Sequence, residues 1–171
     1  MLLNLIILLI IVFLLLLLSM VWPPDSPWAP WWRTSHKTAR AICELARIKK
    51  GDLIYDLGCG DGTALITAAK EFGANGVGIE IDPVRYWTSK IRIRSNGLSK
   101  RITVIRKNFF QENIKNADVV FVYLVPKALE KLLPKFKQEL KKGTRIVSFV
   151  YEITLPLKKY DSKNRIRLYT I

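Results

Sequence analysis

The stretch Asp52–Lys70, DLIYDLGCGDGTALITAAK, decides the fold class of this chain. It begins with a short apolar run typical of a buried strand, continues with glycines at positions 58, 60 and 62, and ends with an alanine-rich segment typical of a helix. Glycine allows positive φ and a close approach of the backbone to a ligand, and the start of a helix offers unpaired N–H groups. The order strand, glycine turn and helix therefore predicts a ligand site at the carboxyl end of the strand.

The acidic residues around this turn narrow the class of ligand. Dinucleotide sites follow G-x-G-x-x-G and bind a pyrophosphate, but here Thr63 stands where the third glycine would be. Asp56 and Asp61 flank the turn and would repel a pyrophosphate. Glu80 ends the next predicted strand, about twenty residues further on, where a carboxylate accepts hydrogen bonds from ribose hydroxyls. These acids favour a nucleoside with a positively charged tail, such as S-adenosylmethionine; tight turns without a ligand are the alternative.

The rest of the chain continues the alternation of strands and helices. The predicted strands are Leu53–Leu57, Gly76–Ile81, Ile102–Ile105, Ala117–Val125, Arg145–Tyr151 and Arg165–Ile171. The predicted helices are Thr38–Arg47, Thr63–Phe72, Pro83–Arg94 and Pro126–Leu140, and Pro134 is expected to kink or split the last one. Such alternation predicts an α/β fold with a Rossmann-like, doubly wound, mostly parallel sheet. The sequence leaves open whether residues 152–171 complete a seven-strand sheet.

The N-terminal segment carries no charged residue from Leu2 to Trp22. About 20 helical residues cross a hydrocarbon core of about 30 Å, so residues 1–22 are predicted to form a transmembrane helix. A cleaved signal peptide is the alternative, but no basic residue precedes the run and Ser19-Met20-Val21 is a poor cleavage site.

Residues 23–37 contain four prolines and three tryptophans, which predicts a stiff linker beside the membrane interface. The remaining domain is residues 38–171. Positive charge begins at Arg33, so the domain is predicted on the cytoplasmic side, or on the matrix side in a mitochondrial inner membrane.

The net charge of +14 falls wholly on the part of the chain after the apolar segment. Such an excess is compatible with nucleic acid, with an anionic membrane surface, or with a lysine-rich proteome. The basic stretches Lys135–Arg145 and Lys158–Arg167 are predicted to hold the domain against anionic lipid, with a solvated charged face as the alternative. Cys43 and Cys59 form neither a disulfide framework nor a metal-ligand spacing, so no metal site is predicted.

From about Arg40 to Tyr151 the sequence resembles the class I, seven-strand S-adenosylmethionine-dependent methyltransferases. It is most similar to a group of membrane-anchored protein-lysine methyltransferases that includes the enzymes acting on the adenine nucleotide translocase and the ATP synthase c subunit, along with prokaryotic relatives. The apolar N-terminus, the Pro/aromatic stretch, DLGCGDG, GIEIDP, and YLVP followed by KALEKLLPKFKQELKKGTRIVS carry this resemblance. It implies the same fold, S-adenosylmethionine as cofactor, and a lysine of a membrane or membrane-proximal protein as acceptor.

The resemblance also implies a role for individual residues in cofactor binding. Asp56 would hold the amino end of the methionine, Glu80 the ribose, and Ile81 would pack on the adenine. Asn108, followed by Phe109, stands where many relatives have an Asp that contacts the adenine amino group. The loop that passes under the cofactor would consist of Gly58, Cys59, Gly60, Asp61 and Gly62.

Methyl transfer mainly requires that donor and acceptor be aligned, so no histidine, cysteine or serine constellation is needed. Tyr123, at the end of the fourth predicted strand, is the candidate catalytic residue that orients the acceptor amine; a core position for this ring is the alternative. A lysine acceptor must lose a proton, and the pKa of a lysine in water is about 10.4. An apolar pocket lowers that pKa.

Three other functions remain open. Net charge would suit an RNA methyltransferase, although the adenine-N6 signature Asp/Asn-Pro-Pro-aromatic is absent from the sequence. A methyltransferase acting on a lipid or quinone headgroup would suit the apolar N-terminus. The last alternative is a tethered binding module without catalysis.

Overall fold

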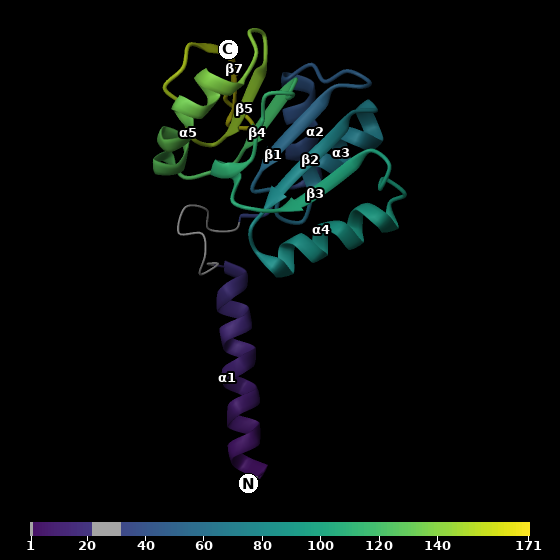
Figure 1. Ribbon diagram of the computed structural model, residues 1–171, viewed down its shortest axis with the longest axis vertical. Coiled ribbons are helices and arrows are strands. Elements are labelled where there is room, and N and C mark those ends of the chain that lie inside the picture. The colour runs from purple at the N-terminus through teal and green to yellow at the C-terminus, as the bar shows by residue number, and fades with distance from the viewer. Residues whose placement is uncertain (1, 22–31) are drawn as a thin grey trace.

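The fold is a seven-stranded sheet in the order β3-β2-β1-β4-β5-β7-β6 (Figure 1). The computed structural model describes residues 2–21 and 32–171. The strands are β1 Leu53–Leu57, β2 Asn75–Glu80, β3 Ile102–Arg106, β4 Val119–Val122, β5 Arg145–Phe149, β6 Leu157–Asp161 and β7 Ile166–Thr170. The helices are α1 Leu2–Val21, α2 His36–Leu45, α3 Thr63–Phe72, α4 Pro83–Ser95 and α5 Pro126–Glu139, with a 3-10 turn at Phe109–Gln111.

Strands β1 to β5 pair in parallel, and β7 joins antiparallel between β5 and β6. The strand order reverses between β1 and β4, and ligands of such sheets bind at the carboxyl ends of the strands near that point. The predicted α/β, Rossmann-like fold is therefore confirmed, and the β6–β7 hairpin completes the seven strands that the sequence left open.

Two details differ from the sequence prediction. Strand β4 ends at Val122 rather than at Val125, because Val125 is the residue that caps α5 and Pro126 begins that helix. Helix α5 runs unbroken through Pro134, so the predicted split is wrong. Leu132 and Phe136, on either side of this exposed proline, are fully buried and hold both halves of the helix against the sheet.

The sheet has an apolar core on each face. One core packs α2, α3 and α4 against the sheet, and the other packs α5. Two glycines of β2 permit the close approach of α3. A Cβ at Gly78 would lie 2.7 Å from the sulfur of Cys59, and one at Gly76 would lie 2.8 Å from a methyl group of Leu65. These glycines thereby let the loop after β1 rest directly on the sheet.

The predicted N-terminal segment forms helix α1, and its large apolar side chains from Leu2 to Leu18 are between 44% and 73% exposed. Across the described residues, none of the helices combines the length and the apolar character that crossing a bilayer requires. Of the linker predicted at residues 23–37, Trp28, Trp31 and the four prolines lie outside the described residues, as does Trp22.

Candidate functional site

A pocket opens at the carboxyl ends of β1, β2, β4 and β5. Including the part open to solvent, it encloses about 860 Å³. The predicted site residues that line it are Asp56, Gly58, Cys59, Gly60, Asp61, Glu80, Ile81, Phe109 and Tyr123. The fold thus gathers residues from four separate stretches of sequence around one cavity, while Gly62 and Asn108 are not among its lining residues.

The loop between β1 and α3 is shaped by glycines with positive φ. Gly58, Gly60 and Gly62 have φ of 85°, 55° and 77°, a region that other residues rarely adopt. The backbone N–H groups of Gly58 and Cys59 both donate to the carbonyl oxygen of Ile79, at 2.9 and 3.1 Å. Gly62 is the N-cap of α3 and lies against α4, since a Cβ there would be 3.4 Å from the Cβ of Ser89. The loop is therefore fastened to β2 on one side and to α4 on the other.

The carboxyl group of Asp56 is buried at the floor of the pocket. Within the part of the chain that the structure describes, no hydrogen-bond donor is paired with its oxygens. Burial, with smaller contributions from Glu80 and then Asp61, raises the pKa of Asp56 from 3.8 to about 7. A buried carboxyl group in this state gains most from a cationic ligand, which a methionine ammonium would provide.

Asp61 has a different environment, although it belongs to the same loop. Its carboxylate pairs with Arg33 at 2.9 Å and with Arg92 of α4 at 2.5 Å. It also accepts hydrogen bonds from the backbone N–H and the hydroxyl of Thr63, at 3.1 and 2.7 Å. Asp61 is thus charge-neutralised by protein groups, and it ties the loop to α4 and to the segment before α2.

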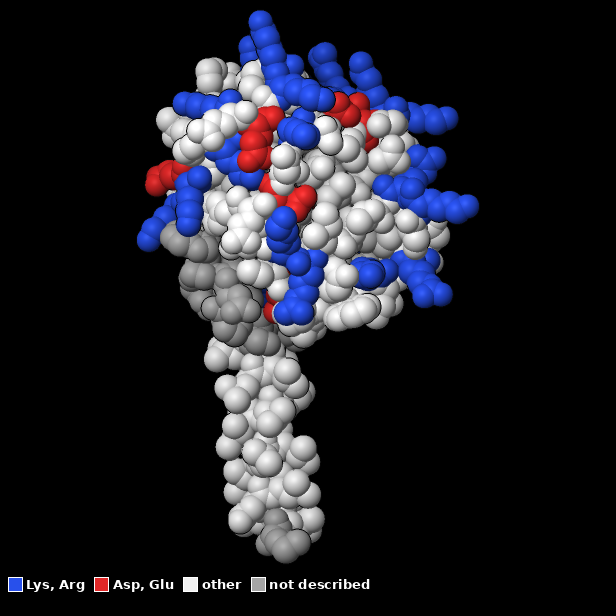
Figure 2. All heavy atoms as spheres, in the orientation of Figure 1, with Lys and Arg blue, Asp and Glu red and all other residues white. Residues whose placement is uncertain are grey.

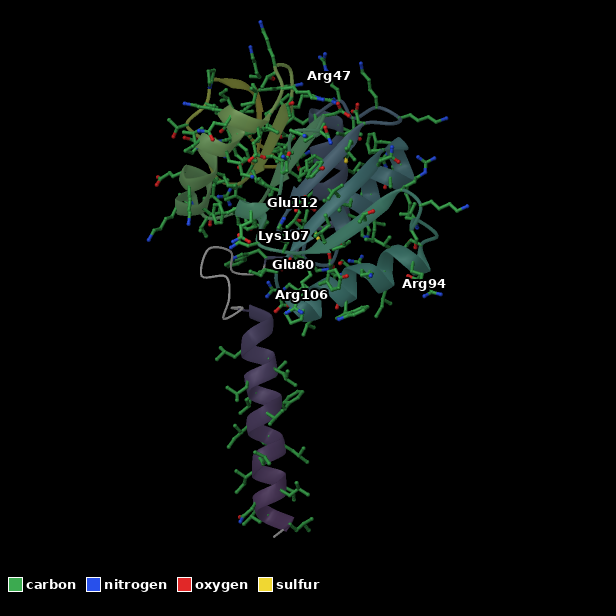
Figure 3. The ribbon with its side chains drawn as sticks, in the orientation of Figure 1. Arg47, Glu80, Arg94, Arg106, Lys107 and Glu112 are labelled. Carbon is green, nitrogen blue, oxygen red and sulfur yellow. The ribbon has the colours of Figure 1, made fainter. Side chains whose placement is uncertain are left out.

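Glu80 ends β2 above the start of α4, beside Arg106 and Lys107 (Figure 3). Its two oxygens accept the backbone N–H groups of Gly60 and Asp82, both at 2.9 Å. Burial raises the pKa of Glu80, although these two hydrogen bonds and the charge of Arg85 oppose the shift. Each carboxylate oxygen can still accept a further hydrogen bond, which is the geometry that a ribose diol requires.

Ile81 and Phe109 line the side of the pocket beyond Glu80, where an apolar ring would fit. Phe109 is buried and its ring centroid lies 4.6 Å from that of Phe110. Asn108 caps the 3-10 turn that carries Phe109, because its side-chain oxygen accepts the backbone N–H of Phe110 at 3.0 Å. The contact between Asn108 and adenine therefore stays a prediction.

Aromatic rings form the other end of the pocket. The ring centroid of Tyr123, just after β4, lies 4.6 Å from that of Phe149 and 6.5 Å from that of Tyr151. Burial raises the pKa of Tyr123, so the phenol stays neutral at physiological pH.

The turn after β5 sets the place of these rings. Val150 has φ of 71°, which is costly for a β-branched residue. It is held there because its N–H donates to the carbonyl of Arg165 at 2.8 Å and its carbonyl accepts from Arg167 at 2.6 Å. Strain of this kind often marks functional sites, and here it turns Tyr151 toward Tyr123.

Several residues of the site were missed by sequence reasoning. Phe149 and Tyr151 lie at the carboxyl end of the predicted strand Arg145–Tyr151, so their position was a usable signal. Arg33, Arg92 and Trp32 are brought in from a loop, a neighbouring helix and the linker, and no local pattern indicated them. Among the described residues, no group of His, Cys, Asp and Glu side chains could hold a metal ion.

Residues 56–156 match the ANTKMT methyltransferase domain family. The chain belongs to this family. A protein-lysine N-methyltransferase of Saccharolobus islandicus is 41% identical over 135 residues, which cover 78% of this chain and 82% of that protein. The lysine N-methyltransferase of the ATP synthase c subunit from Caenorhabditis elegans is 32% identical over 100 residues, and this chain spans about half of its length (51%).

Solved structures agree with this assignment. An RNA methyltransferase from Salinibacter ruber, crystallised with S-adenosyl-L-homocysteine, superposes with a TM-score of 0.79 at 32% identity, covering 82% of this chain and 94% of that one. This ANTKMT-type protein is an S-adenosylmethionine-dependent methyltransferase.

Proposed function

We propose that this methyltransferase transfers a methyl group to the Nε atom of a lysine in a membrane or membrane-proximal protein. The observation that carries the proposal is the pocket itself, which is lined by the buried carboxyl group of Asp56 and by the rings of Tyr123 and Phe149, with Tyr151 beside Tyr123. The lysine specificity named for the relatives in Saccharolobus islandicus and Caenorhabditis elegans supports a lysine acceptor.

In this proposal the cofactor lies along the carboxyl edge of the sheet. Asp56 pairs with the methionine ammonium, Glu80 accepts the ribose hydroxyls, and Ile81 and Phe109 enclose the adenine. The residues of the glycine loop let the backbone pass close beneath it. Asp61 serves mainly to hold the loop, because its charge is already balanced by Arg33 and Arg92.

The chain's part in the reaction is to bind, orient and desolvate the acceptor. S-adenosylmethionine, when bound, supplies a methyl group activated by its sulfonium charge. Tyr123, Phe149 and Tyr151 surround the lysine side chain and exclude water, which lowers the pKa of the lysine amine. The neutral phenol of Tyr123 accepts a hydrogen bond from the amine and aligns its lone pair with the methyl carbon. The lysine ammonium loses one proton to solvent before transfer, and the neutral amine would then form the C–N bond as the C–S bond of the donor breaks, which leaves S-adenosylhomocysteine.

We propose further that α1 inserts in a bilayer and tethers the domain beside it. Figure 2 shows α1 as a shaft without charged side chains, in contrast to the charged surface of the sheet domain. The exposed apolar side chains of α1 support a membrane contact, since contiguous apolar surface of this kind marks interaction or membrane sites. The location on the cytoplasmic side rests on the basic residues that follow the linker. If alkaline carbonate released the full-length protein from membranes as readily as a peripheral protein, the tether would be refuted.

One experiment tests the substrate. The purified full-length protein is incubated with membranes from cells that lack it and with methyl-labelled S-adenosylmethionine, and an Asp56→Asn variant serves as the control. We expect label in a discrete membrane protein, recovered as acid-stable methyl-lysine and absent with the variant. Label in a lipid or quinone fraction would refute the protein acceptor while leaving the cofactor site intact.

RNA is the second candidate substrate. The Salinibacter ruber neighbour is named an RNA methyltransferase, and the net charge of +14 would favour nucleic acid. An RNA acceptor predicts label in the nucleic-acid fraction and binding that weakens steeply with salt. No transfer to any fraction would favour a binding module.

A further inference from the structure

The outer face of α4 exposes an unusual stripe of apolar side chains. Val84, Trp87 and Ile91 lie at i, i+3 and i+7, on one side of the helix, and are 40%, 57% and 65% exposed. A surface helix of a soluble domain normally turns polar side chains outward. Helix α5, on the other face of the sheet, follows that rule, since none of its exposed residues is a large hydrophobic.

The inner face of α4 belongs to the cofactor loop. Arg85, Ser89 and Ile93 are buried against the sheet and the loop, and Arg85 lines the pocket. Arg92 adds the ion pair to Asp61. A partner bound to the outer face of α4 therefore has a fixed distance and orientation relative to the cofactor site.

The charge around the stripe is positive. No acidic residue occurs between positions 83 and 95, and Lys90 and Arg94 flank the apolar side chains. Arg106 lies at one end of α4 and Arg94 at the other (Figure 3). The ammonium group of Lys90 lies 5.3 Å from the ring centroid of Trp87. An indole ring among cationic groups suits the headgroup level of an anionic bilayer.

Chain connectivity keeps this surface near the tether. Trp32 is 65% exposed and lines the pocket, and only eleven steps along the chain separate it from Val21 at the end of α1. Eleven residues span at most about 40 Å even when fully extended. With α1 in the bilayer, as proposed above, the domain stays within this distance of the membrane surface, where even weak contacts with lipid form repeatedly.

We propose that the outer face of α4 docks on an anionic lipid surface, with Val84, Trp87 and Ile91 at the boundary between headgroups and acyl chains. This inference rests on the proposed tether and adds an orientation to it. Docking of α4 lays the carboxyl edge of the sheet along the bilayer, so that the pocket accepts lysines that protrude only a short way from it. Three side chains are too few for a stable protein interface, which buries roughly 1,200–2,000 Å², but they suffice for a second, interfacial contact of an already tethered domain.

The two basic stretches predicted to contact lipid are partly engaged within the fold. In them, Lys135 pairs with Glu139, Arg145 pairs with Asp52, and Arg167 pairs with Glu152. These side chains are engaged within the fold, whereas the α4 stripe presents its apolar groups outward.

A polarity-sensitive fluorophore on α4 tests the proposal. Full-length protein is labelled at Ile91→Cys and reconstituted in phosphatidylcholine vesicles with and without phosphatidylserine; both native cysteines are buried. Gln138→Cys, on the exposed face of α5, is the matched control. We expect a blue-shifted emission at position 91 and roughly twofold quenching by nitroxides carried on lipid, strengthened by phosphatidylserine and absent at position 138. Equal, water-like emission at both positions would overturn the proposal.

A second variant separates docking from folding and from catalysis. The double variant Trp87→Gln, Ile91→Gln is expected to bind S-adenosyl-L-homocysteine as the parent does and to methylate a soluble lysine peptide equally well. Its activity on the same peptide anchored to vesicles is expected to fall severalfold. The labelling experiment needs no methyl transfer, so it stays decisive even if lysine is not the acceptor. Shielding of position 91 in native membranes but not in protein-free vesicles would point to a protein partner and refute lipid docking.

Discussion

The two aspartates at the ends of β1 have opposite environments. Asp52, just before the strand, accepts the backbone N–H of Lys49 at 2.8 Å and pairs with Arg145 at 2.7 Å. Arg145 in turn donates to the carbonyl oxygens of Ala46 and Arg47, at 2.7 and 2.9 Å. Asp56, at the other end of the same short strand, is buried without such partners among the described residues, beside two further carboxylates.

We infer that the two ends of β1 have different roles: Asp52 stabilises the fold, and Asp56 binds a ligand. At the amino edge of the sheet, the carboxylate of Asp52 has protein partners. Through Arg145 it links the end of α2 to β1 and β5. At the carboxyl edge, no cation among the described residues pairs with the buried carboxyl group of Asp56. The energetic cost of burying this charge favours the binding of a cationic ligand. The predictions below test whether the two roles are really separate.

The largest expected effect is the loss of cofactor binding in Asp56→Asn. The variant keeps the shape of the side chain but cannot pair with an ammonium, so affinity for S-adenosyl-L-homocysteine should fall by roughly a hundredfold or more, as for other buried charge pairs. Isothermal titration calorimetry measures the affinity, and thermal unfolding checks the fold. Unchanged affinity would remove Asp56 from the cofactor site.

The pH dependence of binding sharpens the same assignment. Because the pKa of Asp56 is raised to about 7, its proton must leave before it can pair with the ligand, so affinity should fall by up to about tenfold for each pH unit below 7. The stability that the neutral carboxyl contributes is fully present below pH 3.8 and is lost as pH rises through about 7. The free protein should therefore lose stability between pH 4 and 7, and Asp56→Asn should not. Matching pH profiles of parent and variant would contradict the raised pKa.

Asp52→Asn tests the other end of the strand. Removal of this charge leaves Arg145 partly buried without its ion pair, so the free energy of unfolding should fall by roughly 2 kcal/mol. Affinity for S-adenosyl-L-homocysteine at a temperature where the variant is folded should stay within about twofold of the parent, because Asp52 does not line the pocket. Urea unfolding and calorimetry give the two numbers. A large loss of affinity for S-adenosyl-L-homocysteine without a loss of stability would show that Asp52 and Asp56 do not have separate roles.

The aromatic end of the pocket should show the smallest effects. Tyr123→Ala is expected to lower turnover of a lysine substrate by about five- to tenfold, since a ring contact with a cationic or desolvated amine is worth about 1 kcal/mol. Tyr123→Phe keeps the ring and isolates the hydroxyl. If Tyr123→Phe changes neither turnover nor cofactor affinity, the hydroxyl does not orient the amine. Tyr151→Ala, compared with Tyr151→Phe, applies the same test to the neighbouring ring.

Much of this molecule follows from local sequence. The bounds of β1 and α3 agree with the prediction at both ends, because an apolar run, three glycines and an alanine-rich segment encode a strand, a turn and a helix within nineteen residues. The same reasoning predicted that Asp56 and Glu80 share one site, and both line the pocket. Helix α5 shows the limit of local rules, because burial of Leu132 and Phe136 outweighs the local cost of Pro134.

Local sequence specifies the strand–turn–helix unit and the alternating α/β order, since both depend on neighbours along the chain. Only the tertiary structure decided that Asp61 is neutralised by Arg33 and Arg92 while Asp56 is not. The two acids stand five positions apart, Asp56 near the end of β1 and Asp61 in the loop that follows, and no local pattern in the sequence distinguishes their environments. Their difference arises from side chains that the fold brings in from 28 residues before and 31 residues after Asp61, because charge interactions depend on distance in space.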